Sequence, residues 1–123
     1  MMFKKVAMAA ATVAASMGAL MTAPAVQAQE QFVPLLVYRT GQFAPLGIPW
    51  ADGKQDYLKL INAKGGINGV KIKFEECETA YDTAKGVECY ERLKGKDGGA
   101  SGFDTQSTGI TFAVTDKAVG DKI

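Results

Sequence analysis

Histidine is absent from the 123-residue sequence. This removes the commonest general base, the Ser-His-Asp arrangement and histidine metal sites. The segment TGQFAPLG, which follows the first apolar stretch, matches neither the GxGxxG nor the GxxxxGK[ST] phosphate-binding pattern. The acidic residues of FEECETAYD are assigned to a solvated strand end and a helix cap, and not to a metal or acid–base cluster. The sequence therefore predicts a protein that is not an enzyme and that needs no cofactor or metal.

Charge is missing from positions 6–28, which follow Lys4 and Lys5. The segment begins with an apolar, alanine-rich run and ends in APAVQA, with short side chains at the −3 and −1 positions. This is the layout of a secretory signal peptide. A transmembrane anchor is the alternative, but the run contains a glycine and a proline and is poor in leucine and isoleucine. We expect residues 1–28 to be a cleaved signal peptide and the mature chain to begin at Gln29, free in the periplasm.

No basic patch is left once this leader is removed. Of the 14 basic residues, the leader holds two, so 12 remain against 13 acidic residues and the net charge is −1. Nucleic acid and anionic membranes are therefore poor candidates as partners. A mature chain of about 95 residues can bury only a small core.

Cysteine occurs only twice, at Cys77 and Cys89. Their spacing is neither that of a redox CxxC motif nor that of a zinc site. Two cysteines in an exported chain favour a disulfide, here between a strand and the helix that folds back over it. Two buried thiols are the alternative.

The rest of the sequence alternates between strand and helix patterns. The expected elements are a strand over Phe32–Tyr38, a helix over Pro49–Lys64 after a loop over Arg39–Ile48, a strand from Val70, a helix capped by Asp82, a weak strand over Gly98–Phe103, and a helix capped by Ser107 or Thr108. This order predicts an α/β fold in which a parallel sheet carries helices on both faces.

The stretch INAKGGINGVKIKFEE joins a helix to a strand with almost no loop. Gly65 and Gly66 suit the left-handed conformation that ends a helix, and Asn68 and Gly69 suit a second tight turn. The alternation of apolar and charged residues over 70–75 indicates a strand with one wetter face, near a sheet edge. Asn-Gly is also typical of hairpins, but the helix that precedes it argues against one.

Two loops leave the carboxyl ends of the expected strands, where ligands of such sheets bind. One loop covers 39–47 and the other 103–109. The second loop ends at a helix N-terminus, where amide groups and hydroxyls are suited to hold a carboxylate.

In this order and spacing, the motifs resemble those of the type I periplasmic binding proteins of the branched-chain amino acid (Leu/Ile/Val-binding) group. LINAKGGINGVKIKFEE follows the family's N-A-x-G-G-I-x-G-x-x-I/L pattern and acidic strand end. TGQFAPLG looks like the T/S-G-x-x-A-x-x-G loop, and YDTAKGVECYERL takes the place of the D-P-x-x-A helix. STG resembles the S-S-G or S-S-S that opens the third helix. The resemblance covers nearly all of the mature chain.

This resemblance implies a substrate-binding component of an ABC transporter, in which two lobes joined by a three-crossing hinge close on a small solute. The expected solute is an amino acid, an amide or another small carboxylate, and the expected partners are the membrane permease subunits. Family members run to several hundred residues, so we expect residues 29–123 to be an incomplete N-terminal lobe that folds poorly alone. The alternative is a small self-contained exported α/β protein that acts by protein–protein contact and unfolds cooperatively.

Carried over by position, the ligand-binding residues that the resemblance implies are Tyr38, Phe43, Leu46, Gln106, Ser107 and Thr108. The last three would bind a carboxylate and the others would line a side-chain pocket. For Ser107, a plain helix cap is an equal alternative. Trp50 is assigned to packing, and Asp104 is expected to place negative charge beside the pocket.

Overall fold

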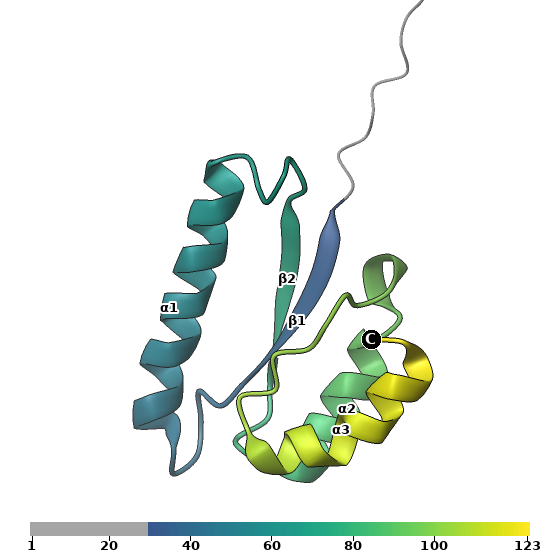
Figure 1. The fold of residues 1–123 in the computed structure, drawn as a ribbon. Helices are drawn as coiled ribbons and strands as arrows, with labels where there is room; N and C mark the ends of the chain where they lie inside the picture. Colours follow the sequence, from purple (N-terminus) through teal and green to yellow (C-terminus); the bar gives the residue numbers. More distant parts are fainter. Residues whose placement is uncertain (1–29) are drawn as a thin grey trace, which may run out of the picture.

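The computed structural model describes residues 30–123, so the proposed leader and Gln29 lie outside the described residues. The elements, labelled in Figure 1, are β1 (Gln31–Val37), α1 (Ala44–Ala63), β2 (Ile72–Glu78), α2 (Thr83–Leu93), a single 3-10 turn (Lys96–Gly98) and α3 (Thr108–Asp121). Figure 1 shows α1 on one face of the two strands and α2 with α3 on the other. The predicted α/β fold with helices on both faces is confirmed.

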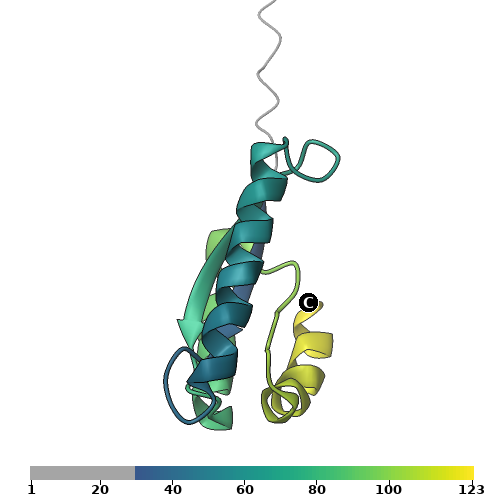
Figure 2. The same ribbon diagram turned by 90° about the vertical axis from the view of Figure 1, so that its left-hand side faces the viewer.

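β1 is buried on both faces. It pairs in parallel with β2 over seven residue pairs. Leu35 and Val37 pack with Ala51 of α1, while Phe32 and Leu36 join the cluster formed with α2 and α3. Figure 2, viewed from the α1 side, shows this helix running along the strands. Burial on two faces explains why the strand is almost continuously apolar.

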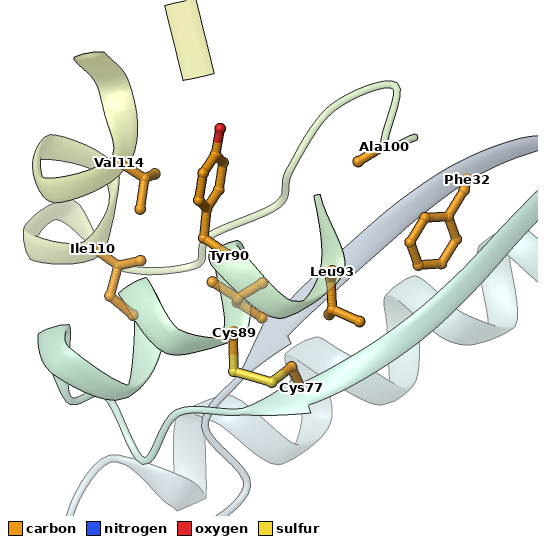
Figure 3. Close-up of a cluster of buried hydrophobic side chains, with 9 residues drawn as sticks. Phe32, Cys77, Cys89, Tyr90, Leu93, Ala100, Ile110 and Val114 are labelled. Carbon is orange, nitrogen blue, oxygen red and sulfur yellow. A yellow bond between two sulfur atoms is a disulfide. The ribbon is translucent and has the colours of Figure 1, made fainter. Parts of the chain in front are cut away.

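The larger core cluster lies between the strands and the α2–α3 pair (Figure 3). Tyr90 and Ile110 are fully buried within it. A disulfide joins Cys77 at the end of β2 to Cys89 in α2, with the two Cα atoms 5.9 Å apart. This bond ties α2 to the sheet inside the apolar cluster.

The first helix begins at Ala44, earlier than the predicted Pro49. The expected loop over residues 39–48 is therefore wrong beyond Phe43, and Pro49 lies inside the helix and not at its first position. Pro49 and Pro45 are both exposed. Pro49 has no N–H to donate to the Pro45 carbonyl, and at this exposed site water can donate to that carbonyl instead.

The weak strand predicted over Gly98–Phe103 does not form. The chain instead makes two isolated parallel bridges beside β1, Phe32 with Ala100 and Leu35 with Asp104. From the first bridge to the second, the segment advances by four residues and β1 by only three, so the segment has one extra residue, as at a β-bulge. At Asp104 the bridge is complete, since its amide donates to the Pro34 carbonyl at 3.2 Å and its carbonyl accepts the Leu36 N–H at 2.9 Å. Between the two bridges, however, Pro34 has no N–H to donate to the segment. The bulge and the missing donor together interrupt the ladder.

The glycine signals after α1 are confirmed. The Gly66 N–H donates to the Ile61 carbonyl at 2.9 Å, which closes the helix end. Asn68 and Gly69 both adopt positive φ, and their turn is closed by the single antiparallel bridge between Ile67 and Val70. Since no further pairing extends this bridge in residues 30–123, the turn forms no hairpin of two strands.

Replacing both Cys77 and Cys89 by alanine should lower the free energy of unfolding by about 3 kcal/mol, because the bond closes a short loop in the unfolded chain. Urea denaturation with and without a reducing agent measures this difference. The reduced wild-type chain serves as the control and should resemble the variant. Equal stability of the oxidised wild type and the variant would contradict a stabilising disulfide.

Candidate functional site

The chain leaves β1 toward α1 and leaves residues 100–104 toward α3, and these two helices lie on opposite faces of the sheet (Figure 1). Where neighbouring strands exit to opposite faces, a crevice opens at their carboxyl ends. A pocket of about 500 Å³ lies at this position. It is lined by Tyr38, Trp50, Tyr81, Thr105, Gln106, Ser107, Thr108, Thr111 and Phe112.

The N-terminus of α3 forms the polar side of the pocket. Ser107 is buried and caps the helix, since its hydroxyl oxygen accepts the Ile110 N–H at 3.4 Å and its carbonyl accepts the Thr111 N–H at 2.8 Å. The first amide groups of an α-helix have no partner within the helix and carry partial positive charge. Anionic or carbonyl groups of a small molecule are therefore favoured at this end.

Gln106 precedes this cap and adopts a left-handed conformation with φ of 48°. Its side-chain nitrogen and oxygen are buried, and neither has a hydrogen-bond partner in the part of the chain that the structure describes. Buried amides are almost always paired, because an unpaired polar group loses its hydration without compensation. The Gln106 amide therefore adds an unused donor and an unused acceptor to the residues of the pocket lining.

Three aromatic side chains, those of Tyr38, Trp50 and Tyr81, line the pocket from elements other than α3. Tyr81 packs edge-on against Tyr38, with ring centroids 5.0 Å apart, and against Phe43 at 4.8 Å. Both Tyr81 and the preceding Ala80 have positive φ, of 63° and 50°. Thr79 supports this loop, since its hydroxyl donates to the Val37 carbonyl at 2.9 Å and accepts the Tyr81 N–H at 3.2 Å. Two successive residues thus adopt the left-handed conformation, which is unfavourable for residues with a side chain, and this loop brings the Tyr81 ring to the pocket.

Gly47 allows Tyr38 to pack against α1. A Cβ atom at position 47 would lie 2.0 Å from the Tyr38 carbonyl oxygen and 2.3 Å from its ring. Any side chain at this position would therefore displace Tyr38 or the helix.

Arg39 follows Tyr38, and its side chain turns to the acidic residues nearby. It donates to both carboxylate oxygens of Glu76, at 2.8 Å and 2.7 Å, and to Asp52 at 2.7 Å. The hydrogen bonds from Arg39 lower the pKa of Glu76 below its ordinary value, and Glu76 in turn raises the pKa of Arg39. The network joins the ends of β1 and β2 to α1 and leaves Arg39 outside the pocket lining.

Asp104 lies outside the pocket lining as well. Its carboxylate pairs with the Lys54 ammonium group, and burial lowers the pKa of Lys54. Both residues line a neighbouring apolar groove of about 490 Å³ between α1 and β1, which shares Trp50 with the pocket. The negative charge expected beside the pocket is thus neutralised by an ion pair, and the nine residues that line the pocket are all uncharged.

Of the six ligand-binding residues predicted, four line the pocket: Tyr38, Gln106, Ser107 and Thr108. Phe43 and Leu46 lie outside the lining: Phe43 packs against the lining residue Tyr81, and Leu46 is 67% exposed on α1. The assignment of Trp50 to packing is wrong, because this side chain is 56% exposed and lines the pocket.

Four lining residues were not predicted: Tyr81, Thr105, Thr111 and Phe112. A sequence signal exists for Phe112, which lies four positions after Thr108 and so shares its face of α3. Tyr81 has no such signal, since its place depends on the left-handed loop.

The geometry agrees with comparisons to known proteins. The family model described as "Periplasmic binding protein" matches residues 30–123. A crystal structure named as an ABC transporter permease from the Pseudomonas fluorescens group is similar, with 42% identity and a TM-score of 0.72, and the match covers 77% of this chain and 24% of that one. No curated protein matches the sequence significantly.

More distant solved structures share the fold. The branched-chain amino acid transporter substrate binding protein LivJ from Streptococcus pneumoniae, in complex with isoleucine, has 21% identity and a TM-score of 0.68, with 77% of this chain and 27% of that chain covered. A fatty acid ABC transporter substrate-binding protein from Thermomonospora curvata has 23% identity and a TM-score of 0.66, with 77% and 24% covered. The chain thus spans about a quarter of the length of the structures it matches.

Within residues 30–123, no group of three or more side chains is placed to hold a metal ion. None of the helices there combines the length and hydropathy that a membrane crossing requires.

Gly47→Ala should lower the free energy of unfolding by about 1–3 kcal/mol, because the new methyl group overlaps Tyr38. Gly53→Ala is the matched control in the same helix, where an added Cβ meets no atom within 4 Å. It should raise the free energy of unfolding by about 0.5–1 kcal/mol through helix propensity. Urea denaturation measures both, and equal stability of the two variants would show that the Tyr38 contact is not tight.

Glu76→Gln should lower stability at neutral pH by about 1–3 kcal/mol, because the Arg39 guanidinium loses its charged partner. Since the folded-state pKa of Glu76 is lowered, its stabilising contribution is present above its ordinary pKa, near 4.5, and is lost as the pH falls through the folded-state value. Urea denaturation at several pH values should therefore give a weaker acid dependence in the variant. The same acid dependence in both proteins would exclude Glu76 as its source.

Proposed function

The chain belongs to the periplasmic binding protein family, and on that premise we propose that it is part of the exported substrate-binding component of an ABC importer. It binds a small solute, an amino acid, amide or other small carboxylate, without changing it chemically. The observation that carries the proposal is the pocket between the end of β1 and the N-terminus of α3.

The polar end of the solute lies at α3. Ser107 and Thr108 present a hydroxyl pair at the start of the helix, and the buried Gln106 amide has both a donor and an acceptor unused. Because the lining is uncharged, a carboxylate is held here by helix amides and neutral side chains and not by an ion pair. A carboxamide satisfies the same groups.

Residues 29–123 form the first part of one lobe in this proposal, and the signal peptide over 1–28 directs the chain to the periplasm. A second lobe closes over the pocket by a hinge motion, and the closed protein delivers its solute to the permease subunits. The similarity to structures named as ABC transporter components supports this arrangement, since the match covers only about a quarter of each of them.

Ser107→Asp tests the proposal while preserving the helix cap, since aspartate caps helices as well as serine does. Contacts from one lobe alone should bind solutes weakly, with a Kd on the order of millimolar. NMR titration of the chain with small carboxylates and amides can follow such binding. The added charge should weaken carboxylate binding at least about ten-fold, because it repels the anion at short range.

Thr115→Asp is the matched control, because it adds the same charge to an exposed position outside the pocket lining, about 12 Å further along the same helix than Ser107. It should leave carboxylate binding nearly unchanged. If no carboxylate, amide or amino acid perturbs the resonances of residues 105–112 in the wild-type chain, the proposed pocket is not a solute site.

A further inference from the structure

We propose that the solute of this pocket carries an aromatic ring next to its carboxylate or amide group, and that Phe112 is a specificity-determining residue for that ring. The inference rests on the proposed function and names the class of solute. It depends on the composition of the lining, the exposure of its rings and the position of Phe112.

The apolar part of the lining is entirely aromatic. Four of its nine residues carry rings, and the other five are small or medium-sized neutral polar residues. Leucine, isoleucine, valine and methionine do not occur among them. Aromatic rings attract one another through stacked or edge-to-face contacts, beyond the effect of buried area. An aliphatic side chain gains only the area term here, so the lining favours a ring.

The rings of the pocket keep part of their surface open. Phe112 is 78% exposed, so its ring has free surface for a solute. Trp50 is 56% exposed, but the Lys54 ammonium group lies over its ring at 5.3 Å. Tyr81 is fixed by Tyr38 and by its left-handed backbone, which is a costly conformation for a residue with a side chain. Exposed aromatic side chains gathered around one pocket indicate a binding surface more than they indicate core packing.

Phe112 lies one helical turn after Thr108, so its ring stands on the same side of α3 as the polar end of the pocket. A solute with its carboxylate or amide at the start of the helix therefore places the next few atoms beside Phe112. Benzoate-like and phenylacetate-like acids, or their amides, have the required short link between ring and polar group.

Benzoate and cyclohexanecarboxylate test this inference as a matched pair, because they share the carboxylate and nearly the same size and differ in aromaticity. NMR titration of the chain should show benzoate binding roughly ten-fold more tightly, as expected from one or two ring contacts. Benzamide should bind in the same place without a charge.

Phe112→Leu should reduce the preference for benzoate over cyclohexanecarboxylate to about two-fold while leaving cyclohexanecarboxylate binding nearly unchanged. The side chain is so exposed that the substitution should not disturb folding. Tyr57→Leu is the control, since Tyr57 is also exposed but lines only the neighbouring groove along α1 and not the pocket. It should keep the preference of the wild type.

Equal affinity for the two acids would overturn the aromatic inference and leave the proposed solute-binding function standing. Preferential binding of glycine betaine would also overturn it, by showing that the rings attract a quaternary ammonium group. If none of these solutes binds, and neither does any amino acid or amide, then both the inference and the proposed function fail.

Discussion

Enclosure of β1 is the constraint on which the rest of the structure depends. α1 packs on one face of this strand and the α2–α3 cluster on the other, while β2 and residues 100–104 lie along its two edges. A strand buried in this way must be apolar throughout, and its polar backbone must be paired on both edges. Pro34 satisfies the first condition and weakens the second, so the neighbouring segment forms bridges without a continuous ladder. The disulfide joins α2 to β2 and so holds this helix against the sheet.

The pocket is a consequence of the same enclosure. Because helices cover both faces, the segments that leave β1 and residue 104 must turn to opposite faces, and the crevice between them cannot be filled by either helix. The close contact of Tyr38 with Gly47 brings α1 down to one side of the crevice. The left-handed loop brings Tyr81 to another side, and the capped end of α3 supplies the polar groups.

Ion pairs around the pocket determine its electrostatic character. The end of the sheet is rich in acidic residues, and its cations pair with them: Arg39 bridges Glu76 and Asp52, and Lys54 pairs with Asp104. The nine residues that line the pocket carry no charge themselves, and the N-terminus of α3 adds partial positive charge to its polar end. That end of the pocket suits a small anion or a neutral amide. The neutral polar side chains can then orient a solute without the desolvation cost of a buried charge.

The sequence by itself determined the alternation of strand and helix patterns, the glycine end of α1, the Asp82 cap and the family, because each depends on residues close together in the chain. It left the cap of α3 open between Ser107 and Thr108. Some local signals still misled. Pro49 reads as a helix start, and Trp50 reads as core because it recurs at helical spacing with Leu58. Only the tertiary structure decided that Gly98–Phe103 is no strand, that Trp50 faces the pocket, and that Tyr81 and Phe112 meet there. These outcomes depend on the register beside Pro34 and on how closely α1 approaches the sheet, which are set by packing between distant segments.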